Sequence, residues 1–341
     1  MAAKAYGKGL RRGFQGKRIA AIQMGKINGA RFLVTGGAGF MGSNLWYALL
    51  KEGASVMAYD NLATGKHSFI EGFEGNGLSF MKGDILDNEK LLSSMSEFKP
   101  DVVVHLAANP NVKLGISNPV REGLESTYSV LDAMAKSGVK AIVFSSSGSV
   151  YGKDALKPTP ENYSPMRPSS LYGAMKLGSE ALISAFSNLY SINYYIFRFA
   201  NVIGRNATHG VIFDLINKLK QNGKELHVLG NGTQTKGYVS IDDVVDAVLY
   251  VYKKSGEREN VFNVASDDQI TVREIAEMVV GKVSKEAKII YGTTREGWPG
   301  DIPDNYISNA KLKAFGFTPK YTSKDAVEAT IDSILYRDKH R

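Results

Sequence analysis

The amino-acid sequence predicts an α/β protein with a doubly wound parallel sheet and a smaller α/β lobe interleaved with it. Three observations support this fold class. A short apolar strand runs into a glycine cluster that opens a helix, apolar strands and helices then alternate up to residue 145, and the regular pattern breaks at residues 151–168. Strands buried on both faces are continuous apolar runs, as in parallel sheets covered by helices.

The first unit is a strand, a turn and a helix. Phe32 to Val34 form the apolar run, and apolar residues recur at helical spacing from Phe40 onward. One inward stripe is expected on this helix, formed by Phe40, Leu45, Leu49 and Leu50. The turn between them has the spacing GxxGxxG, with glycines at Gly36, Gly39 and Gly42. Such a turn lets the backbone approach a pyrophosphate and directs the free N–H groups of the helix start toward phosphates. An ordinary flexible turn is the alternative.

The second strand favours the dinucleotide interpretation of this turn. SVMAY at residues 55–59 is followed by Asp60, whose carboxylate can accept hydrogen bonds from an adenosine ribose diol. A 2′-phosphate would be repelled there, so the sequence predicts NAD as the cofactor in preference to NADP. The glycine turn and Asp60 together predict a Rossmann-type domain.

The alternation continues to residue 145 and then changes. It predicts strands at 78–82, 101–105 and 140–145, with helices at 90–98 and 123–136. Four prolines between residues 151 and 168 indicate a loop over the site. Ser169 and Ser170 can then cap a helix that runs to about residue 190, and a further strand ends near Phe199.

Beyond residue 200 the pattern predicts a second lobe. We expect helices at 211–221, 242–253, 271–283 and 324–336 and strands at 226–229 and 261–264, the last a candidate to return to the main sheet. The expected division is therefore an extension at 1–30, the NAD-binding domain at 31–200, and at 201–341 mainly the second lobe.

Composition excludes several classes of function. The chain has no cysteine, which rules out disulfides, thiolate metal sites and cysteine nucleophiles and makes the cytoplasm the expected compartment. No apolar run is long enough to cross a bilayer, so no membrane segment is expected. His105 and His209 have no third ligand at useful spacing, and no metal site is predicted.

The net charge of +8 does not indicate nucleic-acid binding. Residues 1–30 contain seven Lys and Arg residues and no acid, so the rest of the chain is close to neutral. We expect this extension to be disordered, either cloning-derived or upstream of a start at Met24. An organelle transit peptide is the alternative.

Tyr172 and Lys176 are the first candidates for chemistry, because residues four apart share one face of a helix. A phenol normally has a pKa of about 10. A neighbouring ammonium and a positively charged nicotinamide would favour the phenolate, which could then act as a base. Ser147 follows the fifth strand at the same sheet edge, where its hydroxyl could donate to a substrate oxygen. A lone YxxxK is more often a surface pair, but here it follows a dinucleotide turn.

An ordered set of motifs resembles a known family. TGGAGFMG, DNL, GDILD, HLAA, SSSGSVYG, YGAMK and RFANVIG, between about residues 31 and 320, are similar to the NAD-dependent nucleotide-sugar epimerase/dehydratase branch of the extended short-chain dehydrogenases/reductases. Within it the UDP-glucose 4-epimerases are the most similar. The resemblance implies that the second lobe binds a nucleotide sugar, and that the protein is a homodimer formed through two helices per subunit.

The resemblance also assigns residues. It implies a catalytic triad of Ser147, Tyr172 and Lys176, with Lys176 also holding the nicotinamide ribose. The residues implied to contact the cofactor are Gly36, Gly39, Phe40, Met41, Gly42, Asp60, Asn61, Asp84, Ile85, Leu106, Ala107, Ala108, Tyr172, Lys176 and Phe199. Those implied to contact the substrate are Ser147, Ser149, Tyr172, Asn201, Lys236, Arg295 and Asp301.

Residue chemistry then favours 4-epimerisation among the activities of the branch. A 4,6-dehydratase needs an acid and a base after the triad hydroxyl, but Gly148 and Ser149 stand there, and the decarboxylating relatives are disfavoured similarly. A 3,5-epimerase/reductase of the fucose-synthase type would use a cysteine. A dehydrogenase resembling the short-chain L-threonine dehydrogenases, with net NADH release, is the alternative. A non-catalytic NAD-sensing regulator is disfavoured by the intact triad, and GNGTQ at 230–234 with Asn201 favours the sugar-nucleotide lobe.

Three segments depart from the family pattern. Gly123 stands where an asparagine normally supports the active-site helix, and Lys236-Gly237 replaces the usual Arg-Asp, so a bidentate grip on phosphate is lost. Trp298 replaces the arginine of the RPGD motif, and Arg295 is a candidate to supply the missing guanidinium. By alignment Asn305 occupies the position that controls access of an N-acetyl group, and a residue of its size could admit UDP-GlcNAc as well as UDP-glucose. The base of the nucleotide stays open.

Overall fold

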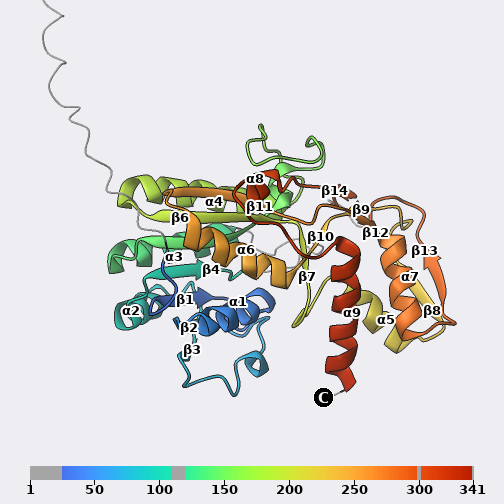
Figure 1. Ribbon diagram of the computed structural model, residues 1–341, viewed down its shortest axis with the longest axis horizontal. Helices are drawn as coiled ribbons and strands as arrows, with labels where there is room; N and C mark the ends of the chain where they lie inside the picture. The colour runs from blue at the N-terminus through green and yellow to red at the C-terminus, as the bar shows by residue number, and fades with distance from the viewer. Residues whose placement is uncertain (1–24, 109–119, 298–300, 340–341) are drawn as a thin grey trace, which may run out of the picture.

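A parallel sheet forms the centre of the computed structural model, which describes residues 25–108, 120–297 and 301–339 (Figure 1). Its strands are β1 (Arg31–Thr35), β2 (Ser55–Asp60), β3 (Leu78–Lys82), β4 (Val102–His105), β5 (Ala141–Ser147), β6 (Asn193–Phe199) and β11 (Glu259–Val264). The order is β11-β6-β5-β4-β1-β2-β3, and every neighbouring pair is parallel. The predicted doubly wound α/β fold is therefore confirmed.

Helices cover both faces of this sheet. One layer contains α1 (Phe40–Lys51) and α6 (Ile241–Lys254), and the other contains α2 (Asn88–Phe98), α3 (Ser126–Ser137) and α4 (Leu171–Tyr190). The alternation of side chains along each strand separates the two layers. In β1, Phe32 and Val34 pack into the α1–α6 core, while Leu33 packs into the α2–α4 core.

The inward stripe expected on the first helix is found in part. Leu45 and Leu49 are buried, whereas Phe40 and Leu50 are only half-buried. Trp46, which the helical spacing did not select, is buried in addition, and its indole N–H donates a hydrogen bond to the carbonyl of Gly37 at 3.0 Å. This bond fastens α1 to the glycine turn that precedes it.

The second lobe has its own small sheets and its own core. Its strands are β7 (Asn201–Ile203), β8 (Glu225–Val228), β9 (Thr235–Lys236), β10 (Tyr238–Ser240), β12 (Ile270–Thr271), β13 (Lys288–Tyr291) and β14 (Asp304–Asn305). They form the parallel pairs β7–β10 and β8–β13 and a three-stranded sheet in the order β12-β9-β14. Around a separate apolar core lie α5 (Val211–Gln221), α7 (Val272–Val283) and α9 (Ser323–Lys339), on the right of Figure 1.

The two parts of the fold are interleaved along the chain. The expected strand near 261–264 is β11, which pairs with β6 from Glu259 to Val264 and forms one edge of the main sheet. Both β11 and α6 follow segments of the second lobe in sequence, and α8 (Ala310–Ala314) also contributes Leu312 to the core of the main sheet. The domain boundary near residue 200 stays a prediction, since the chain crosses between the two parts more than once.

Short helical turns change some expected boundaries. A 3-10 turn, η1 (His67–Phe69), lies in the loop after β2, and η3 (Gly148–Tyr151) follows β5 directly. A π-helical turn, η2 (Val120–Glu125), precedes α3, so the regular helix begins three residues later than predicted. Ser147 is the last residue of β5, not a residue beyond it.

None of the helices in the described part of the chain is long and apolar enough to cross a bilayer.

Candidate active site

The glycine turn after β1 is packed too closely for side chains. Gly36 has φ +70°, in the left-handed region that favours glycine. A Cβ added at Gly42 would lie 2.2 Å from the carbonyl oxygen of Gly36, and one added at Gly36 would lie 2.9 Å from the amide nitrogen of Ala107. Among the described residues no side chain caps the start of α1, so its first N–H groups can bind an anion. This cradle fits a pyrophosphate.

Asp60 joins the glycine turn to the end of β2. Its carboxylate accepts hydrogen bonds from the backbone N–H groups of Ala38 at 3.0 Å and Leu62 at 2.7 Å. Burial raises the pKa of Asp60, and the two backbone donors act against that rise. Each carboxylate oxygen has a further lone pair with which to accept a ribose hydroxyl.

The residues expected around the adenosine lie together beside Asp60. The side-chain amide of Asn61 donates to the Asp84 carboxylate at 3.1 Å, and the hydroxyl of Tyr59 donates to the Asp84 carbonyl at 3.1 Å. Ile85, the next residue, is half-buried. The loop after β3 is thereby held against the end of β2.

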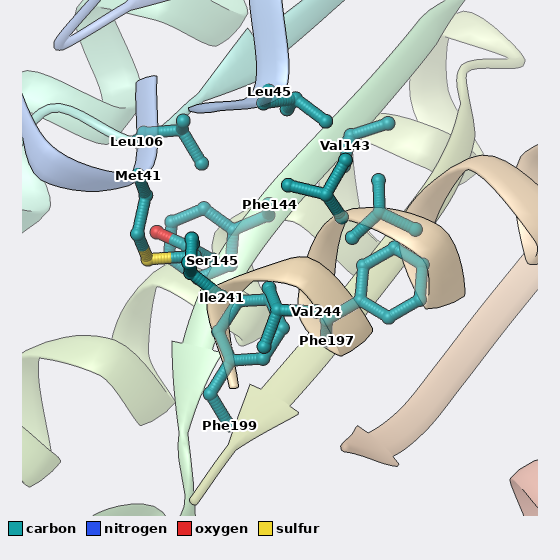
Figure 2. A pocket seen from close by; sticks show the side chains of 12 residues that line it. Met41, Leu45, Leu106, Val143, Phe144, Ser145, Phe197, Phe199, Ile241 and Val244 are labelled. Carbon is teal, nitrogen blue, oxygen red and sulfur yellow. The ribbon is translucent and has the colours of Figure 1, made fainter. Parts of the chain in front are cut away.

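Three residues expected to contact the cofactor line one apolar pocket: Met41 of α1, Leu106 after β4, and Phe199 of β6. Figure 2 shows the side chains of Met41, Leu106 and Phe199 around this pocket, together with Ser145 of β5. Ala107 donates its backbone N–H to the Thr35 hydroxyl at 3.3 Å, which fixes the chain after β4 against β1. Ala108 is half-buried and ends the first described range.

Tyr172 and Lys176 lie in the first two turns of α4. Ser170 caps this helix by accepting from the N–H of Gly173 at 3.1 Å, as predicted for one of the two serines. Lys176 is only 4% exposed, and its Nζ donates to the Ser145 carbonyl at 2.7 Å. The same Nζ lies 5.7 Å from the centre of the Tyr172 ring. The ammonium is therefore anchored to β5 while it faces the phenol.

In the protein without ligands, burial shifts the pKa of both Tyr172 and Lys176. It raises the pKa of Tyr172 to about 12. It lowers the pKa of Lys176 to about 8, against the effect of the negative charge of Glu180. The expected lowering of the phenol pKa is thus not found in the chain by itself. A phenolate at Tyr172 needs a further positive charge in the site, as the sequence argument assumed for the nicotinamide.

Ser147 and Ser149 lie together where β5 meets η3. The Ser147 hydroxyl oxygen accepts from the N–H of Ser149 at 3.2 Å and from its hydroxyl at 3.0 Å. Among the residues that the structure describes, no acceptor takes its own hydrogen. A Cβ added at Gly148 would lie 3.4 Å from the side-chain oxygen of Asn305, so the predicted N-acetyl position borders this turn.

His105 has a structural role at the end of β4. Its ring nitrogens lie 2.8 Å from the Thr35 hydroxyl and 3.4 Å from the Thr127 hydroxyl, and Thr127 lies 2.9 Å from the Ser179 hydroxyl. Burial lowers the pKa of His105 to about 3, so the ring is neutral near pH 7. Across residues 25–108, 120–297 and 301–339, no group of three or more His, Cys, Asp or Glu residues could hold a metal ion.

The missing asparagine of the family pattern has a physical explanation. A Cβ at Gly123 would lie 1.7 Å from Cγ of Met175, the residue that precedes Lys176. Met175 is buried and fills the space next to the π-helical turn. Sequence reasoning did not select Met175, although its place directly before the lysine in YGAMK was visible.

The charged residues expected in the second lobe all form ion pairs. Lys236 of β9 lies 2.7 Å from the Asp301 carboxylate, which also accepts from the N–H of Gly297 at 3.0 Å. Arg295 binds Asp304 of β14 through two contacts of 2.6 and 2.8 Å. Asn201 donates its side-chain amide to the Gly237 carbonyl at 3.0 Å. Trp298, Pro299 and Gly300 lie outside the described residues.

The fold and this site define a dinucleotide-dependent α/β enzyme in which a half-buried tyrosine and a buried lysine lie on one helix face. The chain belongs to the NAD-dependent epimerase/dehydratase family, whose model matches residues 32–265, and NAD is accordingly its cofactor.

Named relatives indicate which branch of the family is similar. The putative UDP-glucose 4-epimerase of Methanocaldococcus jannaschii is 32% identical, over 88% of this chain and 97% of that protein. A crystal structure of UDP-galactose 4-epimerase superimposes with TM-score 0.80 at 33% identity, covering 90% of this chain and 99% of the other. The NAD complex of Thermus thermophilus UDP-glucose 4-epimerase gives TM-score 0.80 at 30% identity, with coverage of 89% and 99%. The family also includes a UDP-glucuronate 4-epimerase and a dTDP-glucose 4,6-dehydratase.

We expect the substitution Gly42→Ala to weaken NAD binding by about 10- to 100-fold, because overpacking this turn costs about 1–3 kcal/mol. The added methyl group would start 2.2 Å from the Gly36 oxygen. NAD released from the denatured protein, measured per mole of chain, tests this. Gly281→Ala on α7 is the matched control, since an added Cβ there meets nothing within 4 Å. Equal NAD content in both variants would contradict the prediction.

Proposed function

We propose that the protein is a UDP-hexose 4-epimerase that interconverts UDP-glucose and UDP-galactose with bound NAD. The observation that carries this proposal is the arrangement of Ser147, Tyr172 and Lys176 at the sheet edge that also bears the glycine turn. Gly148 and Ser149 follow Ser147, so the acid and base that a 4,6-dehydratase needs are absent from that turn.

In the proposed reaction Tyr172 is the base. Its phenolate takes the proton of the sugar C4 hydroxyl while Ser147 donates a hydrogen bond to the same oxygen. When bound, NAD supplies the acceptor and later the donor of the C4 hydride. The 4-keto sugar turns over while its diphosphate stays held, so that hydride would return to the opposite face of C4 and invert the configuration at that carbon only. Tyr172 returns the proton to the C4 oxygen.

Lys176 makes this use of a tyrosine possible. Because burial raises the pKa of Tyr172 to about 12, the phenolate requires compensating positive charge, and the Lys176 ammonium lies 5.7 Å from its ring. The Ser145 carbonyl holds that ammonium in place. We propose that Lys176 also binds the nicotinamide ribose.

We propose that the second lobe holds the nucleotide diphosphate. Asn201 and Arg295 are the proposed phosphate contacts, and the Lys236–Asp301 pair is the proposed edge of the nucleoside site. Arg295 now binds Asp304, so it must exchange this partner for phosphate. Asn305 beside Gly148 is small enough for us to propose that N-acetylated sugars are accepted as well.

We propose that the protein is a cytoplasmic homodimer that pairs through α3 and α4. Tyr128 on α3 and Leu189 on α4 are 50% and 74% exposed. Tyr128 packs edge-on against Phe186, which in turn contacts Tyr190, so these rings form one apolar surface on the two helices. Such a surface suits a second copy of the chain.

Incubation of the purified protein with UDP-galactose, without added oxidant, should yield UDP-glucose and no net NADH, as followed by NMR and by absorbance at the NADH band. Tyr172→Phe should lower this rate by at least about 100-fold and leave the bound NAD in place, because only the proton transfer is lost. Tyr336→Phe, at an exposed tyrosine of α9, is the control. NADH accumulation that requires L-threonine and added NAD+ would favour the dehydrogenase alternative instead.

Arg295→Ala should raise KM for the nucleotide sugar about tenfold or more, as expected when a charge-assisted hydrogen bond is lost, with little change in NAD content. Steady-state kinetics and the NAD assay measure the two effects separately. Arg258→Ala, at an exposed arginine next to the outer edge strand β11, should change neither. Equal damage to KM and to NAD retention would count against a phosphate contact.

Sedimentation should give twice the mass of the 37.1 kDa chain. The double substitution Tyr128→Glu and Leu189→Glu should yield monomers, because charges placed on an apolar interface oppose its burial. Tyr336→Glu introduces the same charge on α9 and should leave the dimer intact. A wild-type monomer at micromolar concentration would refute the assembly.

A further inference from the structure

A buried ion pair lies one helical turn beyond Lys176 and takes no part in the proposed reaction. Glu180 of α4 and Arg198 of β6 have side chains that are 7% and 6% exposed. Arg198 binds the carboxylate through two nitrogens, with Nε 3.0 Å from Oε1 and Nη2 2.6 Å from Oε2. This bidentate geometry gives the strongest type of side-chain ion pair.

Glu180 connects α4 with β5, the helix and the strand that bear the proposed catalytic groups. Tyr172, Lys176 and Glu180 follow one another at four-residue spacing, so they share one face of α4. The Glu180 carboxylate also accepts a hydrogen bond from the hydroxyl of Ser146, the residue before Ser147. Through Glu180, the turn that follows Lys176 is fastened to the end of β5.

Arg198 extends the same network to two further elements. Its Nη1 donates to the hydroxyl of Tyr151 in η3 and to the carbonyl of Glu161, each at 2.9 Å. The Tyr151 hydroxyl donates in turn to the side chain of Asn263 in β11 at 2.8 Å. The position of Glu180 is thus fixed from β5, β6 and, through Tyr151, η3.

Stability alone is a weak explanation for this arrangement. Two charges taken out of water recover their desolvation cost only with good geometry and further hydrogen bonds, and apolar replacements of such pairs are often neutral or stabilising. A buried pair one helical turn from an essential ammonium has another use, because its negative member acts on that ammonium at low dielectric.

Within the described part of the chain, the titratable neighbours of Lys176 are Tyr172 and Glu180 on its own helix and His105 from β4, and Glu180 is the negatively charged one. Arg198 binds Glu180 and donates to the hydroxyl of Tyr151. His105 is neutral because burial lowers its pKa to about 3. Burial lowers the pKa of Lys176 to about 8, and the charge of Glu180 raises it.

We propose that Glu180, held by Arg198 and Ser146, is a positioning residue that seats Lys176 against β5 and keeps its ammonium charged. This inference rests on the proposed roles of Tyr172 and Lys176. It predicts effects of opposite sign for the two members of the pair. Glu180→Gln keeps the shape of the side chain but removes the negative charge, so Lys176 should lose its proton at lower pH. Arg198→Gln removes the opposing positive charge, so Lys176 should keep its proton to higher pH.

A titration of Lys176 tests the inference directly in the NAD-loaded protein without sugar. The ¹³Cε resonance of Lys176, assigned with Lys176→Met, should shift its midpoint down by about one pH unit or more in Glu180→Gln, a change typical for loss of a nearby charge. In Arg198→Gln the midpoint should move up. The double variant Glu180→Gln with Arg198→Met buries no unpaired charge and should also titrate below the wild type, though by less. Glu52→Gln, which breaks the remote ion pair with Lys253, should not move the midpoint.

The alkaline limb of the pH profile for kcat should follow the same order in these variants, with KM changed less than kcat. A midpoint that stays at the wild-type pH in both Glu180→Gln and the double variant, or that moves in the same direction in Glu180→Gln and Arg198→Gln, would overturn the inference. The NMR titration requires no turnover. Failure of the proposed epimerase activity would therefore appear separately, as a wild-type protein that converts no UDP-galactose.

Discussion

The parallel direction of every strand in the main sheet is the constraint on which the site depends. It brings the carboxyl ends of β1, β2, β4, β5 and β6 to one edge, where the chain leaves the sheet and side chains can face a ligand. Gly36, Asp60, Leu106, Ser147 and Phe199 each stand at or just after such an end. Residues far apart in sequence are thereby brought to one edge of the sheet, where we propose that the cofactor binds.

Within that edge, burial sets the chemistry. The Lys176 ammonium is held inside the protein by one backbone carbonyl, and the phenol beside it is far from ionising in the chain alone. In the proposed reaction the Tyr172 phenolate forms only when further positive charge enters the site. Under that proposal, the nicotinamide is part of the electrostatic balance that produces the base.

Much of the fold could be predicted from sequence because its signals are local. The apolar runs, the glycine spacing and the serine cap each lie within a few residues, and α5 has the predicted bounds, 211–221. The burial of Trp46 was missed because one apolar stripe was assumed, whereas Trp46 packs edge-on against Phe73, which belongs to the loop between β2 and β3. The Tyr-Lys pair and Asp60 lie where the motifs indicated, although their roles stay predictions.

What could not be predicted depends on contacts between distant segments. Lys236 and Asp301 pair because β9 and β14 are neighbours, and their sequence separation gives no signal of it. Met175 fills the place left by Gly123 because a π-helical turn brings the two together. The Glu180–Arg198 pair likewise joins α4 to β6. In the sequence, the one indication of this pair was that Glu180 follows Lys176 by four residues.

The interleaving of the two parts has a consequence for how the chain is made. Val244, Val248 and Val251 of α6 cover the core beside α1, and β11 protects the edge of β6, yet both arrive late in synthesis. A ribosome-bound chain that has emerged only to residue 200 carries an unpaired strand edge and an open apolar face, features that promote aggregation. The nucleotide-binding half therefore completes its core only when residues that follow the first segments of the second lobe are available.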